Sequence, residues 1–396
     1  MRISRIKLKN WRNFLDAEAG DLGEVVYLLG QNASGKSNFL DSIRFLQELA
    51  KPMGGGLQGA VEGRGGISKI RCLHARKDEE VSIDVDLADD EGRRGWNYVL
   101  GFNVPNAGDK QSRQPVITKE LVHRFADSGE ETKILERPNI EDRQDSERLQ
   151  QTHLEQISRN KDFRDLANFF GSITYYNLVP QILRYRDKMH GQTHKEDPFG
   201  QEFLSRISGT QAKTRNSQLG KIACALQAIV PQIKDLKFLK DRATGQPHLE
   251  ISFKHRQSLD AKQMEDQFSD GTLRLIALFW LLQESGDAPL LLEEPELYVN
   301  EDVVRQLARI IDSARRKRFE SAGKQVFVST HSYALLSNPG IDAKGIVVVV
   351  PSDEGSIIRK VNEAELIAIM SGFSPAEVVF PNVRGVPVGK QIELDS

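Results

Sequence analysis

The hydrophobic residues of this chain follow two patterns, and the first is a set of short, uninterrupted apolar runs. These runs cover residues 25–29, 290–292, 326–328 and 346–350. Such runs are typical of strands buried on both faces of a sheet. After the first two runs, apolar residues recur at helical spacing: Phe39, Leu40, Ile43 and Leu46, then Val303, Leu307, Ile310 or Ile311, and Ala314. Strands that alternate with helices predict an α/β sheet with right-handed crossovers.

The second pattern is alternation between apolar and polar side chains. Residues 81–87 and 249–253 alternate strictly, and residues 3–8 place three apolar side chains among charged ones. Alternation is typical of antiparallel strands with one solvated face. We therefore expect an antiparallel flank beside the parallel strands.

Three segments lack either pattern. Residues 53–66 are rich in glycine, which predicts a mobile loop. Residues 128–165 are rich in Glu, Gln, Asp and Arg, and they contain no sustained heptads. We interpret them as an exposed helical insertion or a partly mobile arm that is not a long coiled coil. Residues 186–200 resemble another exposed loop.

Composition narrows the class of protein. The chain has 396 residues, of which 39% are hydrophobic and 28% charged. At roughly 100–200 residues per domain, this allows two or three lobes of a globular protein. The formal net charge of -2 excludes a polycation but leaves room for a local basic patch. Cys72 and Cys224 are the only cysteines, too few for a structural zinc site or a disulfide framework.

The sequence also bears on the compartment. The first residues alternate charged and apolar side chains, so they lack the apolar region of a signal peptide. The longest strongly apolar run, near residues 275–282, is shorter than the ~20 residues of a membrane span. We expect a cytoplasmic protein that does not engage a membrane.

The clearest motif follows the first apolar run. Residues 30–37 read Gly-Gln-Asn-Ala-Ser-Gly-Lys-Ser and match G-x-x-x-x-G-K-[ST] in full. Glycines let the main chain wrap a polyphosphate closely, and the next helix directs its positive end at the phosphates. Lys36 would reach the β- and γ-oxygens, and the Ser37 hydroxyl would ligate Mg²⁺. A chance match has roughly one chance in a hundred, and the position between strand and helix favours phosphate binding.

An acidic pair, Glu293 and Glu294, ends the second apolar run. The carboxyl ends of parallel strands form the ligand crevice of an α/β sheet. Glu293 could complete the Mg²⁺ shell, and Glu294 could polarise an attacking water. An exposed helix start at Pro295 and Glu296 is the alternative, which the phosphate loop makes less favourable.

A histidine follows the next strand in the segment Ser329-Thr330-His331-Ser332. A neutral imidazole at a strand end could bind the γ-phosphate or the attacking water. A structural histidine is the alternative. The position of His331, one strand after the acidic pair, favours the functional role.

A second possible anion site precedes a helix that is apolar nearly all round. Residues 268–272 read Phe-Ser-Asp-Gly-Thr. Ser-Asp-Gly is a good helix entry in its own right. A helix N-terminus with a glycine and a serine hydroxyl can also bind an anion.

These segments, in this order, resemble a known family. Asn10-Trp11-Arg12-Asn13-Phe14, the phosphate loop, Ser-Asp-Gly-Thr-Leu-Arg, Glu-Glu-Pro-Glu-Leu and Ser-Thr-His-Ser are similar to the motifs of ABC-type ATPases of the RecF/SMC-like branch. The resemblance is greatest to the compact AAA-type ATPases of OLD-family and bacterial anti-phage systems. It covers about residues 1–60 and 265–350, and residues 173–180 match more loosely.

The resemblance implies roles for individual residues. Glu294 would be the catalytic glutamate, Glu293 would replace the usual Walker B aspartate as a metal ligand with Ser37, and His331 would be the switch histidine. Ser269, Asp270 and Gly271 would form the signature that contacts ATP held by a second subunit. The ATP-binding residues would be Gly30, Asn32, Ser34, Gly35, Lys36, Ser37, Asn38, Arg12 and Asn13.

The chain also departs from its relatives. After the acidic pair they often read Glu-Leu-His-Leu-His-Pro, whereas residues 296–301 here read Glu-Leu-Tyr-Val-Asn-Glu, so the loop that pairs two subunits is altered. Relatives with a nuclease add a Toprim domain after the histidine. Only about 60 residues follow His331, without an Asp-x-Asp motif, so no built-in nuclease is expected.

A run of basic residues marks the helix expected after the acidic pair: Arg305, Arg309, Arg315, Arg316, Lys317 and Arg318. A basic helix face can bind nucleic acid or an acidic protein. A solvated face without a partner is the more common explanation.

The expected fold is α/β, an ABC-ATPase head with a RecA-like mixed sheet, an antiparallel β flank and a helical signature lobe. Residues 1–125 would hold the phosphate loop and flank, residues 126–265 the helical lobe and polar insertion, and residues 266–396 the remaining motifs. ATP and Mg²⁺ would be the cofactors, bound between subunits of a homodimer or larger homo-oligomer.

Two functions are consistent with this interpretation. One is an ATPase switch that senses nucleic acid or a phage product and controls a separate effector, such as a nuclease or toxin. The other is a RecF-like ATPase that clamps DNA in repair or maintenance. A transporter ATPase is less consistent, because the full Leu-Ser-Gly-Gly-Gln signature is missing.

Overall fold

The structure is a computed structural model. It describes residues 1–51, 55–75, 79–104, 114–185, 197–254, 261–284, 286–316 and 323–383.

The central sheet has six strands in the order β15-β14-β3-β13-β12-β8. The strands are β3 (Val25–Leu29), β8 (Thr174–Tyr176), β12 (Leu290–Glu293), β13 (Val326–Thr330), β14 (Ile346–Ser352) and β15 (Gly355–Lys360). All neighbours pair in parallel except β14 and β15, which are antiparallel. The four uninterrupted apolar runs therefore form adjacent parallel strands, as their burial pattern predicted.

A second sheet is antiparallel, in the order β2-β1-β4-β5-β6-β7. Its strands are β1 (Arg2–Trp11), β2 (Phe14–Ala19), β4 (Val81–Ala88), β5 (Arg94–Asn103), β6 (Val116–Phe125) and β7 (Glu131–Arg137). A third, three-stranded antiparallel sheet contains β9 (Ile233–Lys240), β10 (Pro247–Phe253) and β11 (Ala261–Met264). The alternating segments thus lie in antiparallel strands, as expected.

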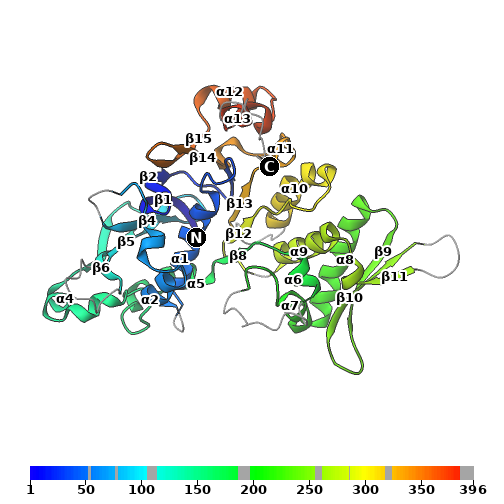
Figure 1. The fold of residues 1–396 in the computed structure, drawn as a ribbon, viewed down its shortest axis with the longest axis horizontal. Helices are drawn as coiled ribbons and strands as arrows, with labels where there is room; N and C mark the ends of the chain where they lie inside the picture. Colours follow the sequence, from blue (N-terminus) through cyan, green and yellow to red (C-terminus); the bar gives the residue numbers. More distant parts are fainter. Residues whose placement is uncertain are drawn as a thin grey trace, which may run out of the picture.

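Helices fill the connections. In the first half they are α1 (Lys36–Leu49), α2 (Gly56–Glu62), α3 (Ile67–Ile70), α4 (Ile140–Gln144), α5 (Arg164–Ser172) and α6 (Pro180–Arg184), with short 3-10 turns η1 (Ser146–Gln150) and η2 (Lys161–Phe163). In the second half they are α7 (Phe203–Gly209), α8 (Ala212–Ile229), α9 (Asp270–Gln283), α10 (Glu301–Arg316), α11 (Tyr333–Leu336), α12 (Glu363–Met370) and α13 (Pro375–Val383), with η4 (Glu265–Gln267) and η5 (Ala343–Gly345). Figure 1 shows α6 to α9 and the three-stranded sheet gathered in one lobe, away from α1.

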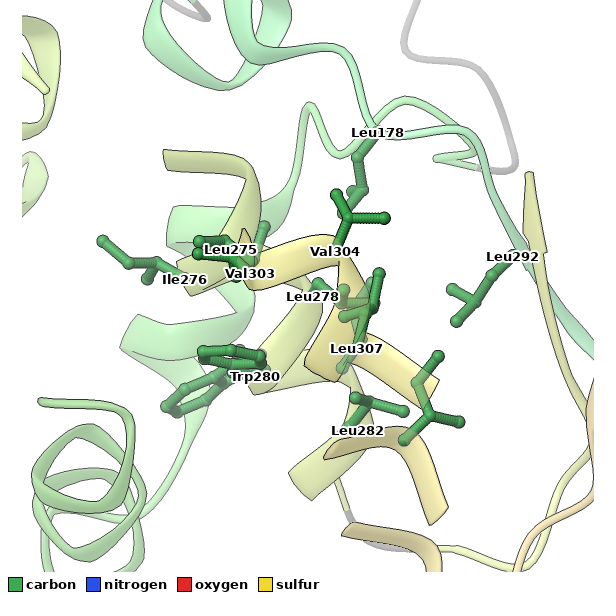
Figure 2. Packing of buried hydrophobic residues seen from close by; sticks show 14 of the residues in the cluster. Leu178, Leu275, Ile276, Leu278, Trp280, Leu282, Leu292, Val303, Val304 and Leu307 are labelled. Atoms are coloured by element: carbon green, nitrogen blue, oxygen red, sulfur yellow. The ribbon is translucent and has the colours of Figure 1, made fainter. Parts of the chain in front are cut away.

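Two hydrophobic cores lie on opposite faces of the central sheet. Leu291 of β12 belongs to the core shared with α1, α5 and the antiparallel sheet. Leu290 and Leu292, its neighbours on the strand, belong to the core shared with α8, α9 and α10. Figure 2 shows part of this second core, where Leu278 of α9 and Leu307 of α10 gather near Leu292. Each strand thus places alternate side chains into different cores.

The glycine-rich segment is more ordered than predicted. The prediction of a mobile loop over residues 53–66 is wrong for its described part, because residues 56–62 form α2. Leu57, Ala60 and Val61 of this helix are buried in the core beside α1. The high glycine content of this segment favoured the prediction of a loop, and the helix has too few apolar residues to show a clear helical period.

The polar segment 128–165 is partly built into the fold, which corrects the interpretation of it as an exposed helical insertion or partly mobile arm. Residues 131–137 form β7 of the antiparallel sheet, so this sheet crosses the predicted segment boundary at 125/126. Arg137 is 2% exposed and forms ion pairs with Glu120 and Asp142, both at 2.9 Å. Leu154 is fully buried in the core. Internal pairing of charges allows this polar segment to pack; the division of the chain into three segments stays a prediction.

Other surface features can be placed in part. Arg315 is buried and pairs with Glu24, so it does not belong to a solvated basic face of α10. Of the loop expected at 186–200, residues 186–196 lie outside the described residues. Within the described part of the chain, no helix has the length and apolar character needed to cross a membrane. The α/β fold with an antiparallel flank and a helical lobe is as expected.

Candidate functional site

The phosphate loop connects β3 to α1, as its motif predicted. Gly35 precedes α1 with φ 111°, a left-handed conformation that favours glycine. A Cβ atom at Gly35 would lie 2.1 Å from the Asn13 side-chain amide. At Gly30, a Cβ atom would lie 2.6 Å from the carbonyl oxygen of Val349. The glycines are therefore required by close packing around the loop as well as by its curvature.

Lys36 is held inside the loop. Its ammonium group donates hydrogen bonds to the carbonyl oxygens of Gly30 (2.9 Å) and Gln31 (3.0 Å). The residue is 6% exposed. Burial lowers the pKa of Lys36, and the carboxylates of Glu294, Glu296 and Glu293 act in the opposite direction. The carbonyl oxygens of the loop thus bind the same ammonium group that the motif predicts to bind a polyphosphate.

Glu293 lies opposite the start of α1. The Ser37 hydroxyl donates to Glu293 Oε1, and the Tyr175 hydroxyl donates to Glu293 Oε2. Burial, and then the negative charge of Glu293, raises the pKa of Tyr175, so the phenol stays protonated. The structure therefore brings together the two predicted metal ligands, and it adds a tyrosine whose role the sequence did not indicate.

Glu294 and His331 meet at the ends of adjacent strands. Nδ1 of His331 lies 2.9 Å from Oε1 of Glu294. Glu294 has φ 42°, which is unusual for a residue with a side chain. Its amide donates to the carbonyl oxygen of Ser329 over 3.0 Å, which helps to hold this conformation. Strained main chain of this kind is concentrated at functional sites.

Two buried ionisable side chains, Glu296 and Arg274, lie close to the acidic pair. Glu296 is 6% exposed and accepts a hydrogen bond from the Thr330 hydroxyl, and burial raises its pKa. Arg274 of α9 is 2% exposed and donates to the carbonyl oxygen of Glu294 over 2.7 Å. Burial lowers the pKa of Arg274. Arg274 belongs to the Ser-Asp-Gly-Thr-Leu-Arg segment, which was the only sign of its role in the sequence.

The side chain of Asn13, between β1 and β2, binds the phosphate loop. Its side-chain amide donates to the carbonyl oxygen of Ser34 (2.7 Å) and to the hydroxyl of Ser356 (2.6 Å). Asn38 in turn donates to Asn13 Oδ1 over 2.8 Å. Arg12 takes a different direction, because its guanidinium pairs with Asp41 at 3.0 Å. Asn13 and Asn38 therefore belong to the loop's support, while Arg12 is engaged on the next turn of α1.

The signature segment caps α9. Ser269 is the N-cap, and its side chain accepts from the amide of Thr272. Asp270 pairs with Arg184 of α6 at 2.7 Å. A Cβ atom at Gly271 would lie 2.4 Å from the carbonyl oxygen of Tyr298, so the N-terminus of α9 packs closely on the loop after the acidic pair. These contacts lie within the helical lobe and the loop at residue 298.

The residues of this edge fit a nucleotide with a divalent cation. Among the residues that the structure describes, the buried hydroxyl of Ser34 has no hydrogen-bond partner, so the loop offers a polar group to a ligand. Ser37 and Glu293 offer adjacent oxygen atoms, the ligand type that Mg²⁺ prefers. Asn32 and Gly35 lie in the same loop, before the positive end of α1.

Comparisons with known proteins give a matching family and a relative. Residues 25–337 match the model of the family described as "AAA domain, putative AbiEii toxin, Type IV TA system". The DNA replication and repair protein RecF of Pediococcus pentosaceus is 23% identical over 371 residues, which is 84% of this chain and 92% of that protein.

Solved structures give the fold. An SMC head bound to the C-winged helix domain of ScpA has a TM-score of 0.53 at 15% identity, over 92% of this chain and 99% of that one. The SMC head domain of Thermotoga maritima has a TM-score of 0.48 at 14% identity, over 91% of this chain and 100% of that one. The first of these likenesses supports an ABC-type ATPase head fold for this chain.

Proposed function

Because the chain belongs to the family described as "AAA domain, putative AbiEii toxin, Type IV TA system", and is an ABC-type ATPase of the RecF/SMC-like branch, we propose that it is an ATP-driven switch controlling a separate effector. One observation carries the ATPase part of this proposal. Five side chains meet at one edge of the central sheet: Lys36, Ser37, Glu293, Glu294 and His331.

Each residue of this edge has a distinct part in hydrolysis. Lys36 exchanges its bonds with the Gly30 and Gln31 carbonyls for phosphate oxygens, which neutralises their charge. Ser37 and Glu293 would hold Mg²⁺, which supplies positive charge to the β- and γ-phosphates. Glu294 orients and polarises the attacking water, and His331, hydrogen-bonded to Glu294, keeps that carboxylate in place.

The complete site would need two subunits. Asp270 pairs with Arg184 of α6, Gly271 packs on the loop at Tyr298, and the Ser269 hydroxyl bonds within its own helix turn. We propose that this segment completes the site of a partner subunit, so that ATP joins two copies of the chain. Hydrolysis would then release the interface.

The effector would be a separate protein, and a nuclease or toxin of a phage-defence system is our proposal for it. The description of the family, which refers to a toxin of a type IV TA system, supports a role in a multi-component system.

The Lys36→Ala variant tests the proposal. It removes the cation of the phosphate loop, so ATP hydrolysis should fall by about two orders of magnitude or more, and ATP affinity should also fall. Lys69→Ala, an exposed lysine on α3, is the matched control and should keep full activity. Thermal melts should show that both variants are folded. Undiminished turnover in folded Lys36→Ala would refute the site assignment.

A second candidate function is a DNA clamp, which the similarity to a RecF protein over most of both chains favours. ATP-dependent binding of duplex DNA, measured by gel shift with and without ATP, would distinguish the two. The clamp predicts a DNA complex that needs ATP and survives in the Glu294→Gln variant. Because the switch also allows nucleic acid as its trigger, it is distinguished by a separate effector protein that binds the ATP-bound assembly, which the clamp does not predict.

A further inference from the structure

Tyr175 lies at the edge of the central sheet, next to the acidic pair. It belongs to β8, a three-residue strand that pairs in parallel with β12, with Tyr175 opposite Leu291. Side chains alternate between the faces of a sheet, so Tyr175, Leu291 and Glu293 share one face. Tyr175 packs against the core that contains Leu291, on the side of α1. Tyr176 belongs to the core on the opposite face.

Glu293 is held by two hydroxyl groups from two different elements. Ser37 of α1 donates to Oε1, and Tyr175 of β8 donates to Oε2. Tyr175 is itself fixed from α1, because the guanidinium carbon of Arg44 lies 5.2 Å from the centre of its ring. The helix that carries Ser37 therefore also positions the tyrosine that binds the other oxygen of Glu293.

A glutamate at this position needs such support more than an aspartate would. Its carboxylate lies at the end of an additional rotatable bond, so without a second contact it would sample more orientations. A hydrogen bond to Oε2 restricts this rotation while Oε1 stays directed at Ser37. The tyrosine hydroxyl thus compensates for the longer side chain.

We propose that Tyr175 is a positioning residue for the divalent-cation site: it fixes the Glu293 carboxylate so that Oε1 and the Ser37 hydroxyl face the cation that accompanies the nucleotide. This inference rests on the proposed ATPase function and deepens it. Outer-sphere partners of metal ligands typically contribute 10- to 100-fold to metal affinity.

The Tyr175→Phe variant tests this role, because it removes only the hydroxyl. The Mg²⁺ concentration for half-maximal hydrolysis should rise about 10-fold. Turnover at saturating Mg²⁺ should stay within about 3-fold of wild type, because the reacting groups are unchanged. A purely structural role would instead lower turnover at every Mg²⁺ concentration.

Nucleotide binding gives a readout that does not depend on hydrolysis. Binding of a fluorescent ATP analogue is measured with EDTA and with Mg²⁺. In the variant, the affinity in EDTA should equal that of wild type, while the increase in affinity on adding Mg²⁺ should shrink by about 10-fold.

Two further variants are matched controls. Tyr176→Phe removes the neighbouring hydroxyl, which contacts Arg206 on the other face, and should leave the Mg²⁺ dependence unchanged. In the Glu293→Asp background, the shorter carboxylate no longer reaches Tyr175, so adding Tyr175→Phe should have little further effect.

The outcomes distinguish failure of the positioning role from failure of the proposed ATPase function. A wild-type Mg²⁺ dependence in Tyr175→Phe would overturn the positioning role, and so would an equal shift in Tyr176→Phe. Absence of nucleotide binding in the wild-type protein would instead overturn the proposed ATPase function.

Discussion

The guanidinium of Arg274 donates a hydrogen bond of 2.7 Å to the main-chain carbonyl oxygen of Glu294. Its other terminal nitrogen donates to the carbonyl oxygen of Leu178 over 2.5 Å, in the segment after β8. Arg274 lies on α9, whose N-cap is Ser269. One buried planar group therefore connects the signature helix to the main chain of the candidate catalytic glutamate. Displacement of α9 by a partner subunit would move Glu294 directly.

We predict that Arg274→Lys slows hydrolysis more than it weakens ATP binding. Lysine keeps the charge but cannot reach both carbonyl oxygens with a planar fork. Loss of one hydrogen bond to a charged group costs about 1.5–3 kcal/mol, so turnover should fall about 10-fold or more. Nucleotide affinity measured in EDTA should change little, since Lys36 and its loop are untouched.

The matched control for this test is Arg215→Lys on α8, whose guanidinium carbon lies 4.2 Å from the centre of the Phe238 ring. It should leave turnover unchanged. A folded Arg274→Lys protein with wild-type turnover would show that the signature helix does not act on Glu294 through this contact.

A second prediction concerns the buried charges of the 128–165 segment. Arg137→Met should remove the ion pair that Glu120 makes with Arg137 at 2.9 Å and leave Asp142 with the longer ion pair to Arg148 at 3.4 Å. Removing one member of a buried ion pair typically costs 3–5 kcal/mol, and urea unfolding should show about this loss. Lys133→Met on the same strand is the control. Lys133 pairs with Glu136 on the surface, so the change should cost about 1 kcal/mol or less. Equal losses in both variants would contradict a packed segment.

This segment shows what composition alone does not reveal. Its charged residues suggested exposure, yet Arg137, Asp142 and Glu120 are buried, and Arg137 forms ion pairs with both carboxylates. Glu120 lies outside the segment, on β6, so the pairing depends on sheet register. No local pattern encodes that register, and the expectation of an exposed insertion or partly mobile arm was therefore wrong for these buried residues.

The placement of the candidate site residues was predictable where they belong to local motifs. The phosphate loop is a continuous motif, and Glu293 follows an apolar run that marks a buried parallel strand. The contact of Tyr175 with the site was not predictable. Its strand, β8, has only three residues, and the Tyr175 hydroxyl binds a carboxylate 118 positions away in the sequence. Arg274 appeared in the sequence only as the last residue of Ser-Asp-Gly-Thr-Leu-Arg. Its contacts were not predictable, because its partners are main-chain carbonyl groups, which every residue has.

A third prediction concerns pH. Burial, and then the positive charge of Arg137, lowers the pKa of His153 to about 4. The folded protein therefore keeps His153 neutral where the unfolded chain would protonate it, near its usual value of 6.5. The stabilisation is complete above about pH 6.5 and is lost as the pH falls toward 4. Urea unfolding at pH 7, 5.5 and 4.5 measures this loss.

The His153→Phe variant isolates this contribution, because phenylalanine does not titrate. Its stability should fall less steeply between pH 7 and 4.5 than that of wild type. His74→Phe, at an exposed position, should leave the slope unchanged. A wild-type slope in His153→Phe would assign the acid sensitivity to carboxylates elsewhere.

The last prediction tests whether ATP joins two subunits through Ser269. Glu294→Gln keeps the size of the side chain but removes the charge that orients water, so hydrolysis should fall steeply while ATP binding by Lys36 and Ser37 persists. With hydrolysis blocked, the ATP-bound assembly should accumulate, and light scattering after size-exclusion chromatography should show a larger mass only when ATP is present. Adding Ser269→Arg should prevent this accumulation without affecting ATP binding, because Ser269 caps α9 in the helical lobe and its side chain makes its hydrogen bonds within its own helix turn.

An assembly of the same mass with and without ATP would preserve the roles of Lys36 and Glu294 but eliminate ATP as the link between subunits. Normal hydrolysis by Glu294→Gln would instead remove Glu294 from the mechanism, and its left-handed main chain would then need another explanation.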